Sequence, residues 1–151
     1  TMSELPADVV ICAAAVADWR LIPEGQEYKK KSAINNKIKK SNKAIIFKTI
    51  PNPDIISEIA KSKTRPKIII GFSAETENVI KNAQDKLIAK NIDLIIANDV
   101  SNKKVFGKDI NKVYVIDKNN CEEWIEQSKK SVAFKLSDKI NKILSLDSTQ
   151  I

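Results

Sequence analysis

KIIIGFSAETENVIKNAQDKLIAKNIDLIIA, residues 67 to 97, is the stretch of sequence that decides the fold. It opens and closes with apolar runs, Lys67–Phe72 and Asp93–Ala97, which are typical of strands buried on both faces of a parallel sheet. A helix is predicted between them, with Thr76 as its cap. Its apolar positions follow helical spacing and comprise Val79, Ile80, Ala83 and Leu87. A strand–helix–strand unit of this kind predicts an α/β fold with an open, mostly parallel, Rossmann-like sheet and flanking helices.

The flanking segments extend this pattern in both directions. Asp8–Ala13 (DVVICA) is a third continuous apolar run, and we predict a strand there that is also buried on both faces. Lys112–Asp117 and Glu123–Gln127 are predicted strands, and Ser137–Leu146 is a predicted closing helix. A chain that enters a buried strand almost at once would lack that strand's neighbours, so we expect a fragment of a larger protein.

The region between the first strand and residue 67 divides into an irregular part and a helix. Residues 20–43 are polar and rich in lysine, which predicts an irregular excursion from the sheet, followed by a short strand at Ile45–Thr49. Asn52, Pro53 and Asp54 supply a cap, a proline for the first helical position and an acid for the first turn. We therefore predict a helix that starts at Pro53.

Composition limits the class of protein. The 151 residues are 42% hydrophobic, enough for one domain, and we predict a single domain over 1–151. The net charge of +7 favours anionic partners such as phosphates, nucleic acid or acidic membranes. The distant Cys12 and Cys121, with no histidine, support neither a disulfide framework nor a zinc site, so a reducing cytoplasm is expected. No apolar stretch approaches the roughly 20 residues that cross a bilayer.

The same composition narrows the chemistry. The chain has no histidine and no G-x-S-x-G motif, which argues against triad hydrolases and most acid/base enzymes. Chemistry that depends on positioning and on charge neutralisation remains, such as transfer at phosphorus.

The loop after the first predicted strand is the first candidate site. In open α/β sheets the ligand lies beyond the carboxyl ends of the strands, and Ala13–Asp18 stands there. The small alanines leave room for close approach, and Asp18 is suited to a magnesium ion that bridges phosphate oxygens. The alternative is that the alanines pack beneath a helix while Asp18 caps a turn.

Lysines supply the second set of candidates. Lys37 begins the sequence KIKK and, with the run Lys29–Lys31, concentrates positive charge suited to clamping a phosphate, although such a run is also typical of a solvated loop. Lys86 and Lys90 lie four apart on the predicted helix and would repel each other in an empty site, so an anion between them is one interpretation and simple solvation the other. Phe72, at a strand end, is compatible with a contact to a base or with the core.

Six blocks in order carry a family resemblance: AAAVADWR, KIKK, NPDI, GFSAETE, DLIIANDV and FGKDINKV. They resemble the phosphopantothenoylcysteine synthetase family. The resemblance implies ligation of 4'-phosphopantothenate to cysteine with CTP, by way of an acyl-cytidylate. It also implies a homodimer, in which the lysine-bearing excursion reaches toward the partner, and linkage to an FMN-dependent decarboxylase part that this chain does not contain.

Position by position, the resemblance implies a set of nucleotide contacts. They are Cys12, Ala13, Ala14, Asp18, Lys37, Pro53, Asp54, Ile55, Ile56, Phe72, Lys86 and Lys90. Within this set Asp18 would act through magnesium on the triphosphate, and Lys37 would be catalytic by neutralising charge on the leaving pyrophosphate.

Three departures from the family qualify these expectations. The glycine-rich first portion of the synthetase is absent, so the isolated chain is expected to be inactive or to bind only nucleotide. The spacing from Asp18 to KIKK is longer than the family's, which makes Lys30 and Lys31 rivals of Lys37. The family's GFAAE is GFSAE here, with Ser73 at the changed position.

Two other classes of function compete with this interpretation. A nicotinamide-dependent dehydrogenase is disfavoured because the chain's three glycines form no G-x-G-x-x-G. An RNA-binding module fits the charge, but aromatic residues make up only 5% of the chain and no basic, aromatic-rich strand motif is present. The sequence does not decide between CTP and ATP.

Overall fold

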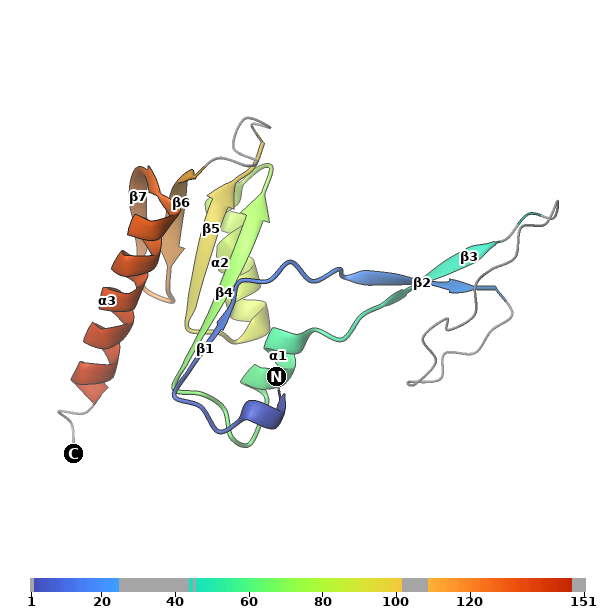
Figure 1. The fold of residues 1–151 in the computed structure, drawn as a ribbon, viewed down its shortest axis with the longest axis horizontal. Helices are drawn as coiled ribbons and strands as arrows, with labels where there is room; N and C mark the ends of the chain where they lie inside the picture. The colour runs from blue at the N-terminus through green and yellow to red at the C-terminus, as the bar shows by residue number, and fades with distance from the viewer. Residues whose placement is uncertain (1, 25–43, 45, 102–108, 148–151) are drawn as a thin grey trace. The chain divides into compact units, whose positions relative to one another are not determined.

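A computed structural model describes residues 2–24, 44, 46–101 and 109–147 of the chain (Figure 1). The fold divides into two compact units. Unit 1 comprises Thr1–Ala13 and Ile55–Ile151, and unit 2 comprises Ala14–Asp54. The single nucleotide-binding domain expected over 1–151 stays a prediction.

Unit 1 is built on a five-stranded sheet with the order β1-β4-β5-β6-β7. The strands are β1 (Val9–Cys12), β4 (Ile68–Glu75), β5 (Leu94–Asp99), β6 (Ile110–Ile116) and β7 (Cys121–Ser128). β1, β4 and β5 are parallel, whereas β6 is antiparallel to both β5 and β7. All the strands of this sheet except β6 therefore run in one direction, which confirms the predicted open, mostly parallel α/β sheet.

Helices cover both faces of this sheet. α2 (Val79–Lys90) packs on one face near the short α1 (Ile55–Ala60), and α3 (Lys129–Asp147) lies on the other (Figure 1). A 3-10 turn, η1 (Met2–Glu4), precedes β1. On the α2 face the fully buried apolar residues include Ile59, Ile69, Ala83, Leu87, Ile92 and Ile116. On the α3 face the buried apolar residues include Ile70, Ile96, Val113, Val115, Val132 and Leu136. These two layers fix the strand ends that carry the candidate site.

β1 differs from its prediction in burial. It lies at the edge of the sheet, where it pairs with β4 and with no other strand among the described residues. Ile11 is consequently 48% exposed, so the prediction of a strand buried on both faces is wrong here. An apolar run indicates a strand but does not say how many neighbours it has.

Two helix boundaries also differ from the sequence-based expectation. α2 begins at Val79, after Asn78 in a left-handed conformation, so Thr76 is not its cap. α3 begins at Lys129 rather than at Ser137, because the Oγ atom of Ser128 accepts the N–H of Ser131 at 3.0 Å and caps an additional two turns.

Unit 2 contains an antiparallel ribbon of two strands, β2 (Trp19–Pro23) and β3 (Phe47–Pro51). The prediction that the chain is irregular from residue 20 is therefore wrong for its first residues, because their pairing partner lies far along the sequence. The strand predicted at Ile45–Thr49 is found slightly later, as β3. Residues 25–43, with most of the lysine-rich excursion, lie outside the described residues.

Candidate functional site

The base of the unit 2 ribbon places Asp18 beside Asn52. The backbone N–H of Asn52 donates to the carbonyl oxygen of Asp18 at 2.8 Å, and its Nδ2 donates to the carbonyl oxygen of Ala17 at 2.7 Å. Asn52 is therefore a clasp of the ribbon, not the helix cap that was predicted. The helix starts later than the predicted Pro53, at Ile55.

Asp18 presents an exposed carboxylate next to this clasp. Among the described residues no group of three or more acidic, cysteine or histidine side chains is arranged to hold a metal ion. One carboxylate suits an ion that takes its other ligands from phosphate oxygens and water, as magnesium commonly does. The chemistry of Asp18 thus fits the predicted magnesium–triphosphate role.

In unit 1, the carboxyl end of β1 lies beside the middle of β4 and brings other predicted residues near one another. Cys12, half-buried, is in register with Gly71, the residue before Phe72. A Cβ atom at Gly71 would stand 3.2 Å from the Cδ1 of Ile56 and 2.9 Å from that of Ile92. This close approach explains the glycine, and it packs α1 against β4 beside Cys12. Phe72 lies in the middle of β4, which continues to Glu75, so the prediction that it stands at a strand end is wrong.

The side chains along the end of β4 alternate between the two faces. Phe72 shares the face of Ile68 and Ile70, which pack toward α3, and is 39% exposed. Ser73 and Glu75 are buried on the opposite face, toward α2. A ligand contact through the ring of Phe72 would therefore lie on the other side of β4 from α2.

Lys86 reaches from α2 to the end of β4. Its Nζ lies 2.6 Å from the Oε1 of Glu75, whose side chain is 9% exposed. This carboxylate compensates the charge of Lys86, so the predicted repulsion between Lys86 and Lys90 in an empty site is reduced. Lys90 is the last residue of α2 and is half-buried.

Further charged groups lie near the same edge of the sheet. Hydrogen bonds from Ser101 lower the pKa of the Asp99 carboxyl at the end of β5. The pKa of Lys112 on β6 is raised, first by its hydrogen bond to Glu123 and then by Tyr114. Both groups are therefore held in their charged forms at neutral pH.

Ser73, the position that departs from the family, carries an unsatisfied hydroxyl. Its Oγ is buried and has no hydrogen-bond partner among the described residues. Since an unsatisfied buried hydroxyl costs roughly 1–3 kcal/mol, Ser73→Ala is expected to raise the free energy of unfolding by about 1 kcal/mol. Urea denaturation of both chains measures this difference, and a loss of stability in the variant would show that the hydroxyl has a partner in solution.

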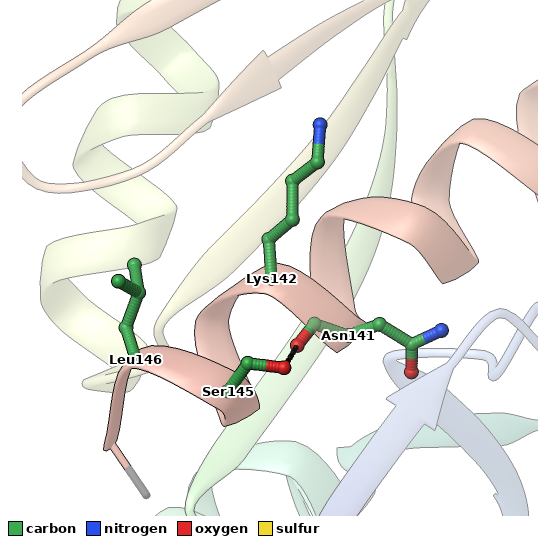
Figure 2. A pocket seen from close by; sticks show the side chains of 4 residues that line it. All are labelled: Asn141, Lys142, Ser145 and Leu146. Carbon is green, nitrogen blue, oxygen red and sulfur yellow. Dashed lines mark hydrogen bonds between the residues drawn. The ribbon is translucent and has the colours of Figure 1, made fainter. Parts of the chain in front are cut away.

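A shallow hollow elsewhere carries none of these residues. It is lined by Asn141, Lys142, Ser145 and Leu146 on the last turns of α3 (Figure 2). Ser145 Oγ donates to the carbonyl oxygen of Asn141 at 2.7 Å, so its hydroxyl is used within the helix. The last turns of α3 lie toward the amino ends of β4 and β5 (Figure 1).

The predicted site residues are thus distributed over both units. Unit 1 holds Cys12, Ala13, Ile55, Ile56, Phe72, Lys86 and Lys90, and unit 2 holds Ala14, Asp18, Pro53 and Asp54. Lys37, like Lys30 and Lys31, lies outside the described residues. Sequence reasoning missed the contact of Glu75 with Lys86, although an acid at the end of a buried strand is an available signal. It also missed the clasp at Asn52, which has no local signal.

Comparison with known proteins places the chain in a family. Residues 1–144 match the family described as "DNA/pantothenate metabolism flavoprotein C-terminal domain". The chain belongs to this family. Its resemblance to the synthetase part of the bifunctional coenzyme A enzymes is thereby confirmed.

Relatives in the family carry the name "Coenzyme A biosynthesis bifunctional protein CoaBC". The protein of Borreliella burgdorferi is 42% identical over 128 residues, which are 83% of this chain and 30% of the relative. That of Haemophilus influenzae is 39% identical over 142 residues, 94% of this chain and 32% of the relative. The chain therefore spans about a third of the length of these relatives.

A solved structure supports the fold of this family member. The crystal structure of the C-terminal domain of a CoaBC protein superposes with a TM-score of 0.66 at 28% identity, covering 95% of this chain and 58% of the other. Within the described residues, no helix is long and apolar enough to span a membrane.

Proposed function

We propose that this chain is the nucleotide-binding part of a phosphopantothenate–cysteine ligase in coenzyme A biosynthesis, with CTP as the nucleotide. The observation that carries the proposal is the packing of Ile56 against Gly71 beside Cys12, at the carboxyl end of β1, in a family whose relatives are named for that pathway. Open α/β sheets bind their ligands at this edge.

The proposed reaction has two steps. The carboxylate of 4'-phosphopantothenate attacks the α-phosphorus of CTP and releases pyrophosphate, and the amine of cysteine then displaces CMP from the acyl-cytidylate to form the amide. Lys37 neutralises the charge that develops on the leaving pyrophosphate. Main-chain groups of Pro53, Asp54, Ile55 and Ile56, where the chain enters α1, contact the nucleotide.

Asp18 would hold magnesium on the triphosphate, where the ion supplies neutralisation of phosphate charge. In this proposal Ala13 and Ala14, both exposed and without bulk, leave room beside β1 for the nucleotide. The residues described here include no candidate for a general base.

The proposal extends to partners and location. The ligase acts as a homodimer in the cytoplasm, linked to an FMN-dependent decarboxylase part that is outside this chain, and binds neither nucleic acid nor membrane. A mass measurement in solution tests the dimer directly, and a monomeric mass at micromolar concentration would contradict it for this chain.

Thermal denaturation with CTP and magnesium tests the nucleotide site. At a hundredfold excess over the dissociation constant, binding stabilises the native state by about 2.7 kcal/mol, which raises Tm by roughly 5–10 °C. Asp18→Asn is expected to abolish the shift because it removes the carboxylate that faces the ion. The control is Asp85→Asn, which breaks an exposed ion pair with Lys81 on α2 and leaves the shift intact.

Competing nucleotides and RNA complete this experiment. Stabilisation by NAD in preference to CTP would favour a dehydrogenase-like site and contradict the ligase. A salt-dependent affinity for RNA with no response to CTP would point to a nucleic-acid module instead.

A further inference from the structure

Glu75 is a buried carboxylate to which the proposed reaction assigns no role. It ends β4 on the α2 face, with its side chain 9% exposed, and its Oε1 accepts a hydrogen bond of 2.6 Å from the Nζ of Lys86. The carbonyl oxygen of Glu75 also accepts the N–H of Val100 at 2.9 Å, which fixes its backbone against the end of β5. The carboxylate therefore stands on a rigid support.

The two partners differ in how freely they can leave the pair. The side chain of Lys86 is 45% exposed, so part of it faces solvent while it contacts Glu75. An ammonium group has three N–H donors, and the pair uses one of them. If Lys86 moved away, the carboxylate of Glu75 would be left buried without its counter-charge, which is strongly unfavourable. Lys86 consequently stays on Glu75 and offers its remaining donors outward.

We propose that Glu75 is a positioning residue for Lys86, which uses its outward N–H donors to bind an uncharged part of the nucleotide, the base or the ribose, rather than a phosphate. The inference rests on the proposed function, because it assigns a ligand to a residue of that site.

Charge is the reason for this choice of ligand. A lysine whose charge is compensated by a carboxylate 2.6 Å away attracts a phosphate much less than an unpaired lysine, because the phosphate would also be repelled by Glu75. Hydrogen bonding to a neutral oxygen carries no such penalty. The Glu75–Lys86 pair therefore favours recognition of carbonyl or hydroxyl oxygens.

Chemical acylation tests the positioning without any nucleotide. Acetic anhydride acylates accessible lysine amines, and the Nζ of Lys86 is held against a carboxylate that is only 9% exposed, so the rate at Lys86 is expected to be about tenfold lower than at Lys81, the exposed partner of Asp85 on the same helix. Glu75→Gln should raise the Lys86 rate to that of Lys81. Equal rates at the two lysines in the native chain would overturn the positioning role. Where Glu75→Gln does not fold, Glu75→Asp, which shortens the side chain but keeps its charge, serves in the same comparison and should raise the Lys86 rate in part.

Affinities for cytidine, CMP and CTP test the ligand. Loss of a hydrogen bond from a charged donor corresponds to a roughly tenfold to hundredfold weaker affinity, and Lys86→Met should show it equally for all three compounds. A loss that grows with the number of phosphates would overturn the assignment. Glu75→Gln should weaken cytidine binding in the native background but have no further effect in the Lys86→Met background, because Glu75 acts only through Lys86. If the losses of affinity from the two substitutions were additive, Glu75 would act independently of Lys86, in a merely structural role.

The two proposals fail in different ways. If the native chain binds none of cytidine, CMP and CTP, the proposed function and the ligand of Lys86 are both contradicted, while the acylation rates still decide whether Glu75 positions Lys86. If CTP binds with the native affinity to Lys86→Met, the nucleotide site stands and the inference about Lys86 is wrong.

Discussion

Replacing Leu87 by alanine is expected to lower the free energy of unfolding by about 2–5 kcal/mol, because it opens a cavity in the core on the α2 face. Leu87 is 1% exposed and packs with Ile59, Ile69 and Ile92 in that cluster. Its helix also carries Lys86 and Lys90. The variant should therefore lose stability in urea denaturation and, if the proposed function holds, bind CTP less tightly.

The adjacent residue supplies a matched control. Ile88 lies on the same helix but is 70% exposed, so Ile88→Ala should change stability by less than about 0.5 kcal/mol. Similar losses in the two variants would mean that the side chain of Leu87 is not in the core in solution.

Replacing Asp93 by alanine is expected to lower the free energy of unfolding by about 2–4 kcal/mol. The Asp93 carboxylate accepts bonds of 3.0 and 2.9 Å from the Nη2 of Arg65 and a third, of 2.8 Å, from the backbone N–H of Ile69. Because Ile69 is fully buried, the substitution leaves its N–H without that acceptor. The same change weakens the start of β4, where Arg65 also donates to the carbonyl oxygen of Pro66 at 2.8 Å.

The comparison with Asp85→Asn separates this effect from the loss of an ordinary surface ion pair. Asp85 and Lys81 are both largely exposed, and such pairs contribute roughly 0–1 kcal/mol. Asp93→Asn should fall between the two, since its amide oxygen keeps the bond from Ile69 but loses the charge opposite Arg65. If the Asp93→Ala and Asp85→Asn variants were equally stable, the proposal that Asp93 anchors the start of β4 would be contradicted.

The sheet could be predicted from sequence because its inner strands are continuous apolar runs. The first four residues of β4 and of β5 are buried on both faces, and their apolar composition indicates this directly. The exposure of β1 could not be predicted in the same way. Among the described residues β1 has one neighbouring strand, β4, and its own residues do not indicate how many neighbours it has. β2 was missed since its pairing with β3 joins residues far apart in sequence.

The candidate site was predictable residue by residue but not in its contacts. Motif blocks contain Asp18 and Phe72, and the four-residue spacing from Lys90 singled out Lys86, whereas the bond between Glu75 and Lys86 depends on how α2 packs on β4. The clasp between Asn52 and Asp18 likewise follows from ribbon pairing, which diverted Asn52 from the helix cap that its sequence context favoured. Local chemistry identifies candidates, and tertiary packing assigns their partners.

The clasped ribbon of unit 2 also bears on how the chain tolerates changes of length. Asp18 and Asn52 are joined at its base, and Pro23 lies opposite Phe47 at its far end, so the ribbon holds together the two points between which the intervening sequence runs. The entropy of closing such a loop grows only with the logarithm of its length, and doubling the length costs about 0.6 kcal/mol. Residues can therefore be inserted between Pro23 and Phe47 with little effect on stability. The unusually long spacing from Asp18 to the KIKK block falls within this tolerance, because the added length lies between the two paired strands of the ribbon.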